Sequence, residues 1–148
     1  MELLFGLPAH PLITHFPVVA VPLTSVAALY LVLRPSKIEG HAFIVGGFAI
    51  VTAISTILAA SSGEAFAELI GSGESIDRHR QLGEALRLIS VVQASFISTM
   101  LVASKKEVSK GVSVVLSAGV VITSVLALIW VIRTGHEGAS QTWGFFVS

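Results

Sequence analysis

The stretch LITHFPVVAVPLTSVAALYLVL, residues 12–33, contains no Asp, Glu, Lys or Arg and decides how the chain folds. A helix needs about 20 consecutive apolar residues to cross the hydrocarbon core of a bilayer, and this stretch is long enough. Three further stretches are equally free of these residues: 42–63, 88–104 and 111–132. The stretch at 88–104 is short, so its helix is expected to begin near residue 81. Together they predict a chain that crosses a membrane four times.

The composition also departs from that of a water-soluble domain. Hydrophobic residues make up 53% of the 148 residues and charged residues only 12%, which leaves too little polar surface to cover a soluble globule. We therefore predict an all-α membrane protein, an antiparallel bundle of four transmembrane helices that forms a single membrane domain over residues 1–148. The expected helices span about 10–33, 42–62, 81–104 and 111–134, with an outer loop at 63–80.

The expected outer loop contains signals for two pieces of structure. Residues 63–70 have an amphipathic pattern that could extend the second helix or lie at the membrane surface. The sequence Gly71-Ser72-Gly73 then breaks this pattern, because glycine disfavours a continuing helix. Ser75 is expected to cap the helix that follows.

The charged loops indicate an orientation. Two short loops, at residues 34–41 and 104–110, contain the basic residues Arg34, Lys37, Lys105, Lys106 and Lys110. Short loops rich in Lys and Arg remain on the cytoplasmic side of a membrane, so both termini and the loop at 63–80 are expected outside. The net charge of zero gives no indication of nucleic-acid binding. The absence of cysteine excludes disulfides, thiolate clusters and the covalent attachment of c-type haem.

Four of the five histidines fall at the ends of the expected helices. His10 and His15 open the first helix, His79 opens the third and His136 closes the fourth. Four antiparallel crossings bring these ends to one membrane face. Imidazole is a ligand for iron, copper, zinc and nickel, and helix bundles commonly hold metals and haem between facing helices. The sequence therefore predicts a cofactor site at the outer end of the bundle.

The residues around these histidines suit haem. A flat macrocycle needs small neighbours, and the candidates are Gly83, Gly135 and Gly138. The propionates of haem need cations, and the candidates at this end are Arg78, Arg80, Arg87 and Arg133. These arginines could instead reach toward the interface or pair with acids, as in Glu84 with Arg87. His10 and His15 lie about 140° apart around an ideal helix, so they would serve two haems, or one would ligate while the other supports it.

The opening sequence His10-Pro11-Leu12-Ile13-Thr14-His15-Phe16-Pro17 resembles the HPxxxHFP motif of the DUF2231 family of small four-helix bacterial and archaeal membrane proteins. Three later elements are similar to further marks of that family, in the same order: Ser62-Gly63-Glu64-Ala65, His79-x-x-x-Gly83 and Gly135-His136-x-Gly138. The chain departs from the pattern at Ala139, where a second glycine is expected, and at Trp143, near an expected tyrosine. The resemblance implies the plasma membrane of a prokaryote. It also implies haem binding and membrane electron transfer, since family members occur fused to Rieske and cytochrome-type domains.

The leading hypothesis is a membrane b-type cytochrome, an electron-transfer subunit rather than a stand-alone enzyme. It would bind one or two haem b groups through His15, His79 and His136, with His10 as a fourth ligand. Its partners would be the lipid bilayer and a redox protein, a larger membrane complex or further copies of the chain. The alternatives are a copper or zinc site built from the same histidines, and a structural subunit of a larger complex. No Gly-x-Ser-x-Gly or His-Glu-x-x-His motif indicates a hydrolase.

Overall fold

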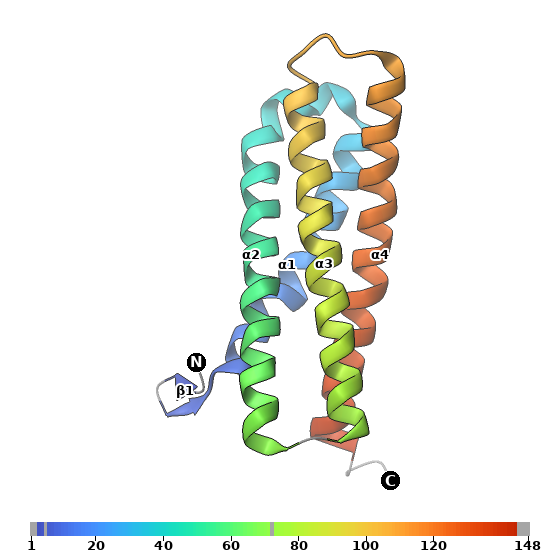
Figure 1. Ribbon diagram of the computed structural model, residues 1–148. Coiled ribbons are helices and arrows are strands. Elements are labelled where there is room, and N and C mark those ends of the chain that lie inside the picture. The colour runs from blue at the N-terminus through green and yellow to red at the C-terminus, as the bar shows by residue number, and fades with distance from the viewer. Residues whose placement is uncertain (1–2, 5, 72, 145–148) are drawn as a thin grey trace.

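A computed structural model describes residues 3, 4, 6–71 and 73–144, and four long helices dominate it (Figure 1). The helices are α1 (Ala9–Leu33), α2 (Ile38–Ile70), α3 (Glu74–Ala103) and α4 (Lys110–Trp143). A short 3₁₀ helix, η1 (Pro35–Lys37), precedes α2, and the strands β1 (Leu3–Leu4) and β2 (Leu7–Pro8) form a small antiparallel hairpin before α1. All four long helices are long and apolar enough to cross a membrane. The predicted four-helix membrane bundle is confirmed.

The helices pack as a ring in which each contacts the next in sequence and α4 contacts α1. Helices α1 and α3 are therefore diagonal, as are α2 and α4. The start of α1, the end of α2, the start of α3 and the end of α4 share one end of the bundle, while η1 and the loop at 104–109 share the other (Figure 1). This antiparallel order is the one that the sequence predicts, and it gathers helix ends from distant parts of the chain.

The expected outer loop at 63–80 is corrected by the structure, which continues α2 to Ile70 and begins α3 at Glu74. No glycine or proline interrupts residues 64–70, so nothing stops the helix before Gly71. Gly71 has a φ of 95°, a left-handed value that glycine adopts without strain, and its N–H bonds the Ala67 carbonyl. Helix α4 likewise extends beyond the expected end at 134. These extensions form the walls of the site described below.

A buried polar layer divides the core between two apolar clusters. One cluster, toward the end where α1 starts and α4 ends, contains Val21, Leu86, Ala127 and Val131. The other, toward the η1 end, includes Ala28, Leu31, Ile97 and Val120. Between them, the Gln93 amide donates hydrogen bonds to the hydroxyls of Ser25, at 3.0 Å, and Ser124, at 3.1 Å. A single side chain thus ties α3 to both α1 and α4 where a bilayer supplies no competing water.

Replacing Gln93 by leucine is expected to lower the free energy of unfolding by about 1 kcal/mol, because it removes two interhelical hydrogen bonds at a site that is 1% exposed. The measurement is unfolding by sodium dodecyl sulfate in mixed micelles. The same substitution at Gln81, which is exposed on the same helix, is the matched control. Equal stability of the Gln93 variant and the wild type would contradict a stabilising role.

Candidate functional site

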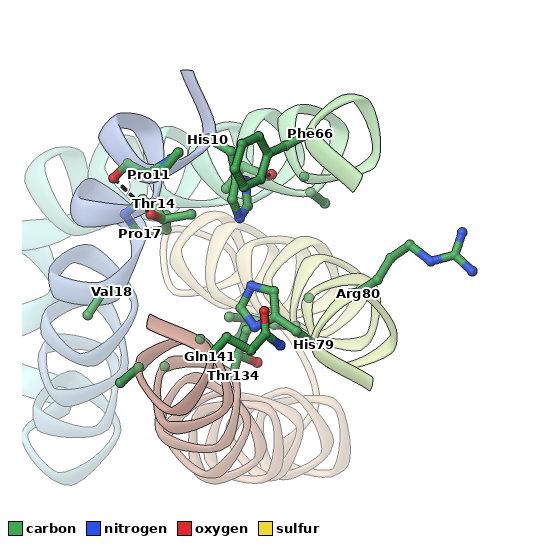
Figure 2. Close-up of a pocket in the computed structure, with 18 of the residues that line it drawn as sticks. His10, Pro11, Thr14, Pro17, Val18, Phe66, His79, Arg80, Thr134 and Gln141 are labelled. Carbon is green, nitrogen blue, oxygen red and sulfur yellow. Dashed lines mark hydrogen bonds between the residues drawn. The ribbon is translucent and has the colours of Figure 1, made fainter. Parts of the chain in front are cut away.

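All four helices line one cavity of about 480 Å³ at the end of the bundle where α1 starts and α4 ends (Figure 2). Small residues form much of its wall: Ala59, Ala60, Gly63, Gly83, Gly135 and Gly138. Phe66, Leu86, Val131 and Trp143 supply larger apolar surface. Three of the four predicted histidines also line it: His10, His15 and His79. The cavity therefore combines apolar walls with a few imidazoles.

His10 is fixed to the backbone of the neighbouring helix. Its Nδ1 atom lies 3.1 Å from the Ala59 carbonyl oxygen and 3.1 Å from the Ser62 hydroxyl. The Ser62 hydroxyl itself donates to the Ala59 carbonyl, so Nδ1 is best assigned as the protonated nitrogen that donates to these oxygens. Nε2 then remains the free acceptor of a neutral ring. Metal-binding histidines commonly have this arrangement, in which one nitrogen is held by a backbone carbonyl.

His79 faces His10 across the cavity (Figure 2). The ring centroids lie 5.9 Å apart and the planes meet at 81°. The buried His79 Nδ1 atom makes no hydrogen bond of ordinary geometry among the described residues, but the Thr134 backbone carbonyl acts on the ring as a hydrogen-bond acceptor. The place of the ring in the cavity wall, beside His10, makes it a candidate for binding a ligand.

Two glycines seat these rings against the backbone. A Cβ atom added at Gly63 would lie 2.9 Å from His10 Cε1, and one added at Gly138 would lie 3.0 Å from His79 Cε1. Any larger residue would push the imidazoles out of place. The sequence predicts Gly138 as a neighbour of a macrocycle, whereas in the structure it seats His79. Gly63 is absent from the predicted site residues, although it belongs to one of the family-like elements.

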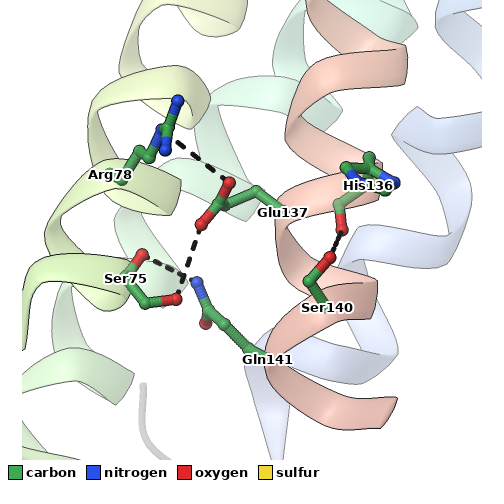
Figure 3. Close-up of polar contacts among 6 residues, drawn as sticks. All are labelled: Ser75, Arg78, His136, Glu137, Ser140 and Gln141. Atoms are coloured by element: carbon green, nitrogen blue, oxygen red, sulfur yellow. Dashed lines mark hydrogen bonds and ion pairs between the residues drawn. The ribbon is translucent and has the colours of Figure 1, made fainter. Parts of the chain in front are cut away.

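The other two predicted histidines lie apart from this pair. His15 lines the cavity but is exposed, and its Nδ1 donates to the Pro11 carbonyl of its own helix. His136 is exposed and is not among the cavity-lining residues, while its backbone carbonyl accepts a hydrogen bond from Ser140 (Figure 3). Of the four histidines predicted to converge, the structure brings two rings into contact.

The four predicted arginines all have partners within the protein. Arg80 lines the cavity and lies 3.8 Å from Asp77, whereas Arg87 pairs with Glu84, as the sequence allowed. Arg78 on α3 lies 3.9 Å from Glu137 on α4. Within α4, the Arg133 guanidinium lies 5.3 Å from the centre of the Trp130 ring. Their binding of propionates stays a prediction. Gly83 and Gly135 do line the cavity, and an added Cβ at either would meet nothing within 4 Å.

The donor set discriminates between kinds of metal centre. In the part of the chain that the structure describes, no three His, Cys, Asp or Glu side chains come together around a possible ion. Zinc sites take three or four protein ligands. Haem iron receives four ligands from the porphyrin and needs no more than two from the protein. The neighbouring imidazoles of His10 and His79 could supply these two ligands.

Comparison with known proteins places the chain in a family. Residues 6–148 match the model of a family described as "Predicted membrane protein (DUF2231)". No curated protein and no solved structure matches the chain. The match covers all four helices and the cavity between them.

Proposed function

The chain belongs to the DUF2231 family of predicted membrane proteins, and from that premise and the cavity geometry we propose a membrane b-type cytochrome that binds haem between His10 and His79. The proposal narrows the four candidate ligands to two. It keeps the expected role, an electron-transfer subunit in a membrane. The bundle and its apolar surface support the membrane location.

One observation carries the proposal: the separation of the His10 and His79 rings. Two imidazoles that share one metal ion through bonds of about 2 Å have ring centroids roughly 6 Å apart. The observed separation is 5.9 Å, and the rings come from the diagonal helices α1 and α3.

The walls of the cavity support a large flat ligand. Its volume of about 480 Å³ falls in the usual range for small-molecule sites. Glycine and alanine at eight wall positions leave the space that bulkier side chains would fill. Phe66 stacks on the His10 ring, with ring centroids 6.1 Å apart and planes inclined by 20°. This contact limits rotation of His10 and favours one ring orientation.

Each wall residue would contribute a definite effect on a bound haem. The haem iron supplies the one-electron chemistry. His10 and His79 would bind it, while the Ala59 carbonyl and Ser62 hydroxyl hold the His10 tautomer that leaves Nε2 free. Leu86 and Val131 form the floor of the cavity and exclude water, which tunes the reduction potential. A second haem would have to use His15 and His136, and it stays a prediction.

The position of the site suggests how electrons leave it. The cavity lies at one end of the bundle, so transfer to a neighbouring protein is favoured over transfer across the bilayer. A redox partner or larger membrane complex is therefore part of the proposal. The five basic residues of the opposite loops would place that end in the cytoplasm of a prokaryotic cell. The haem site and both termini would then face outside.

The direct test is a visible spectrum of the detergent-purified protein, oxidised and then reduced with dithionite, with a pyridine haemochrome assay. A sharp reduced α-band and a b-type haemochrome are expected from protein made in haem-replete cells. A colourless protein that also fails to take up added haemin would overturn the proposal. Elemental analysis would then separate a non-haem metal site from a structural bundle.

Substitution of Gly63 by alanine is expected to weaken haem binding about tenfold without unfolding the bundle. The added methyl group would lie 2.9 Å from His10 Cε1, so it displaces the ring from its seat, an effect comparable to losing a group that orients a metal ligand. Haemin titration monitors the affinity and circular dichroism monitors the helices. Gly47→Ala on the same helix is the control, because its Cβ would meet nothing within 4 Å. Equal haem affinities in the two variants would show that the close approach of Gly63 to the His10 ring is not needed for haem binding.

A further inference from the structure

Polar contacts fasten the start of α3 to the end of α4 beside His79 (Figure 3). The Gln141 side-chain amide donates to the Ser75 backbone carbonyl at 2.8 Å. The Ser75 hydroxyl donates to Glu137 at 3.5 Å, and Glu137 also lies 3.9 Å from the Arg78 Nε atom. The sequence predicts Ser75 as the cap of this helix. In the structure the residue at the N-cap is Gly73, two positions earlier, and the Ser75 hydroxyl contacts α4 instead.

These contacts act on the backbone of His79. In an α-helix, each N–H bonds the carbonyl four residues earlier, so Ser75 supplies the acceptor for the His79 N–H. Gln141 therefore hydrogen-bonds the carbonyl that also holds the His79 backbone. Gly138, one turn before Gln141 on the same side of α4, seats the His79 ring. Backbone and ring are both contacted by one face of α4.

The start of α3 needs such support. Its N-cap residue is Gly73, which provides no side-chain hydrogen bond to the first turn. A helix start without a cap leaves backbone N–H groups unsatisfied and frays readily. His79 lies in the second turn, so fraying of the first turn would move its ring. The α4 contacts bond the Ser75 carbonyl and hydroxyl rather than these N–H groups, and they hold the first turn against α4.

We infer that Gln141 and Glu137 are positioning residues that hold His79 in place for its ligand. The importance of this role for haem rests on the proposed function, but the effect on His79 exists without haem. Gln141 is the main element, because it forms the shorter bond and contacts the backbone directly. Glu137 adds a second contact, and its carboxylate also acts electrostatically on the His79 ring. Neither residue is a ligand in this account.

The first experiment uses the full-length protein without haem in detergent micelles. Gln141→Leu is expected to speed amide hydrogen exchange at residues 77–80 about fivefold, the loss expected for one hydrogen bond. The NMR signals of the His79 ring nitrogens should shift as well. Ser140→Ala is the matched control, because Ser140 lies in the same turn and its hydroxyl donates to the His136 carbonyl of its own helix (Figure 3). Unchanged exchange and unchanged ring signals in Gln141→Leu would overturn the inference.

The second experiment separates this inference from the proposed function. If the wild type binds haem, Gln141→Leu should retain it but shift the midpoint potential and broaden the reduced α-band, while Ser140→Ala should not. A protein that binds no haem would overturn the proposed function, and the exchange and ring signals would still decide the positioning role. Faster exchange with unchanged His79 ring signals would show that Gln141 fastens the helix only, which also overturns the inference.

Discussion

Replacing His79 by alanine is expected to abolish the haem spectrum of the purified protein while the four-helix bundle remains folded. The imidazole is one of two rings that meet in the cavity, and under the proposed function its removal would leave the iron a single protein ligand there. Losing a residue that only supports a ligand costs about 10–100-fold in metal affinity, so losing the ligand should cost more than about 100-fold. Haemin titration of the purified variant measures the loss. His10→Ala should behave in the same way.

The matched controls are the histidines that the structure places elsewhere. His136→Ala and His41→Ala should keep the wild-type spectrum, because His136 is exposed outside the cavity wall and the His41 ring bonds the Lys37 carbonyl. Loss of the spectrum in His136→Ala would favour the set of ligands predicted from sequence over the pair seen in the structure. A wild-type spectrum in His79→Ala would refute the proposed pair.

Replacing Gly119 by alanine is expected to lower the free energy of unfolding by about 1–3 kcal/mol, the usual cost of overpacking a close contact. A Cβ atom at this position would overlap the Phe96 ring. Glycine therefore sets how closely α4 approaches α3. Unfolding by sodium dodecyl sulfate in mixed micelles measures the change.

A double-mutant cycle separates this contact from the helix propensity of alanine. Phe96→Leu removes the ring that the new methyl group would strike, so Gly119→Ala should cost much less in that background. The same cost in both backgrounds would refute the contact as the cause. Because neither Gly119 nor Phe96 lines the cavity, the affinity for haem expected under the proposed function should change little per folded molecule.

The number and direction of the helices follow from the sequence because a bilayer imposes them. Every backbone polar group in hydrocarbon must be paired within the helix, so four uncharged stretches become four spans. Short connections make neighbouring spans antiparallel, which brings the helix ends with His10, His79 and His136 to one end. The end of α2 was harder to predict, because residues 63–70 have an amphipathic pattern that suits either a loop or a helix that continues beyond the hydrocarbon.

Which side chains meet is decided only by the tertiary structure. The rotation of each helix about its axis depends on packing at distant positions, such as Gly119 against Phe96 and Gln93 between α1 and α4. That rotation turns His10 and His79 toward one another and leaves His136 exposed. The sequence therefore determined the membrane fold and the end of the bundle where histidines gather. The selection of one pair, and the glycine seats that hold it, arise from contacts between helices that no local pattern encodes.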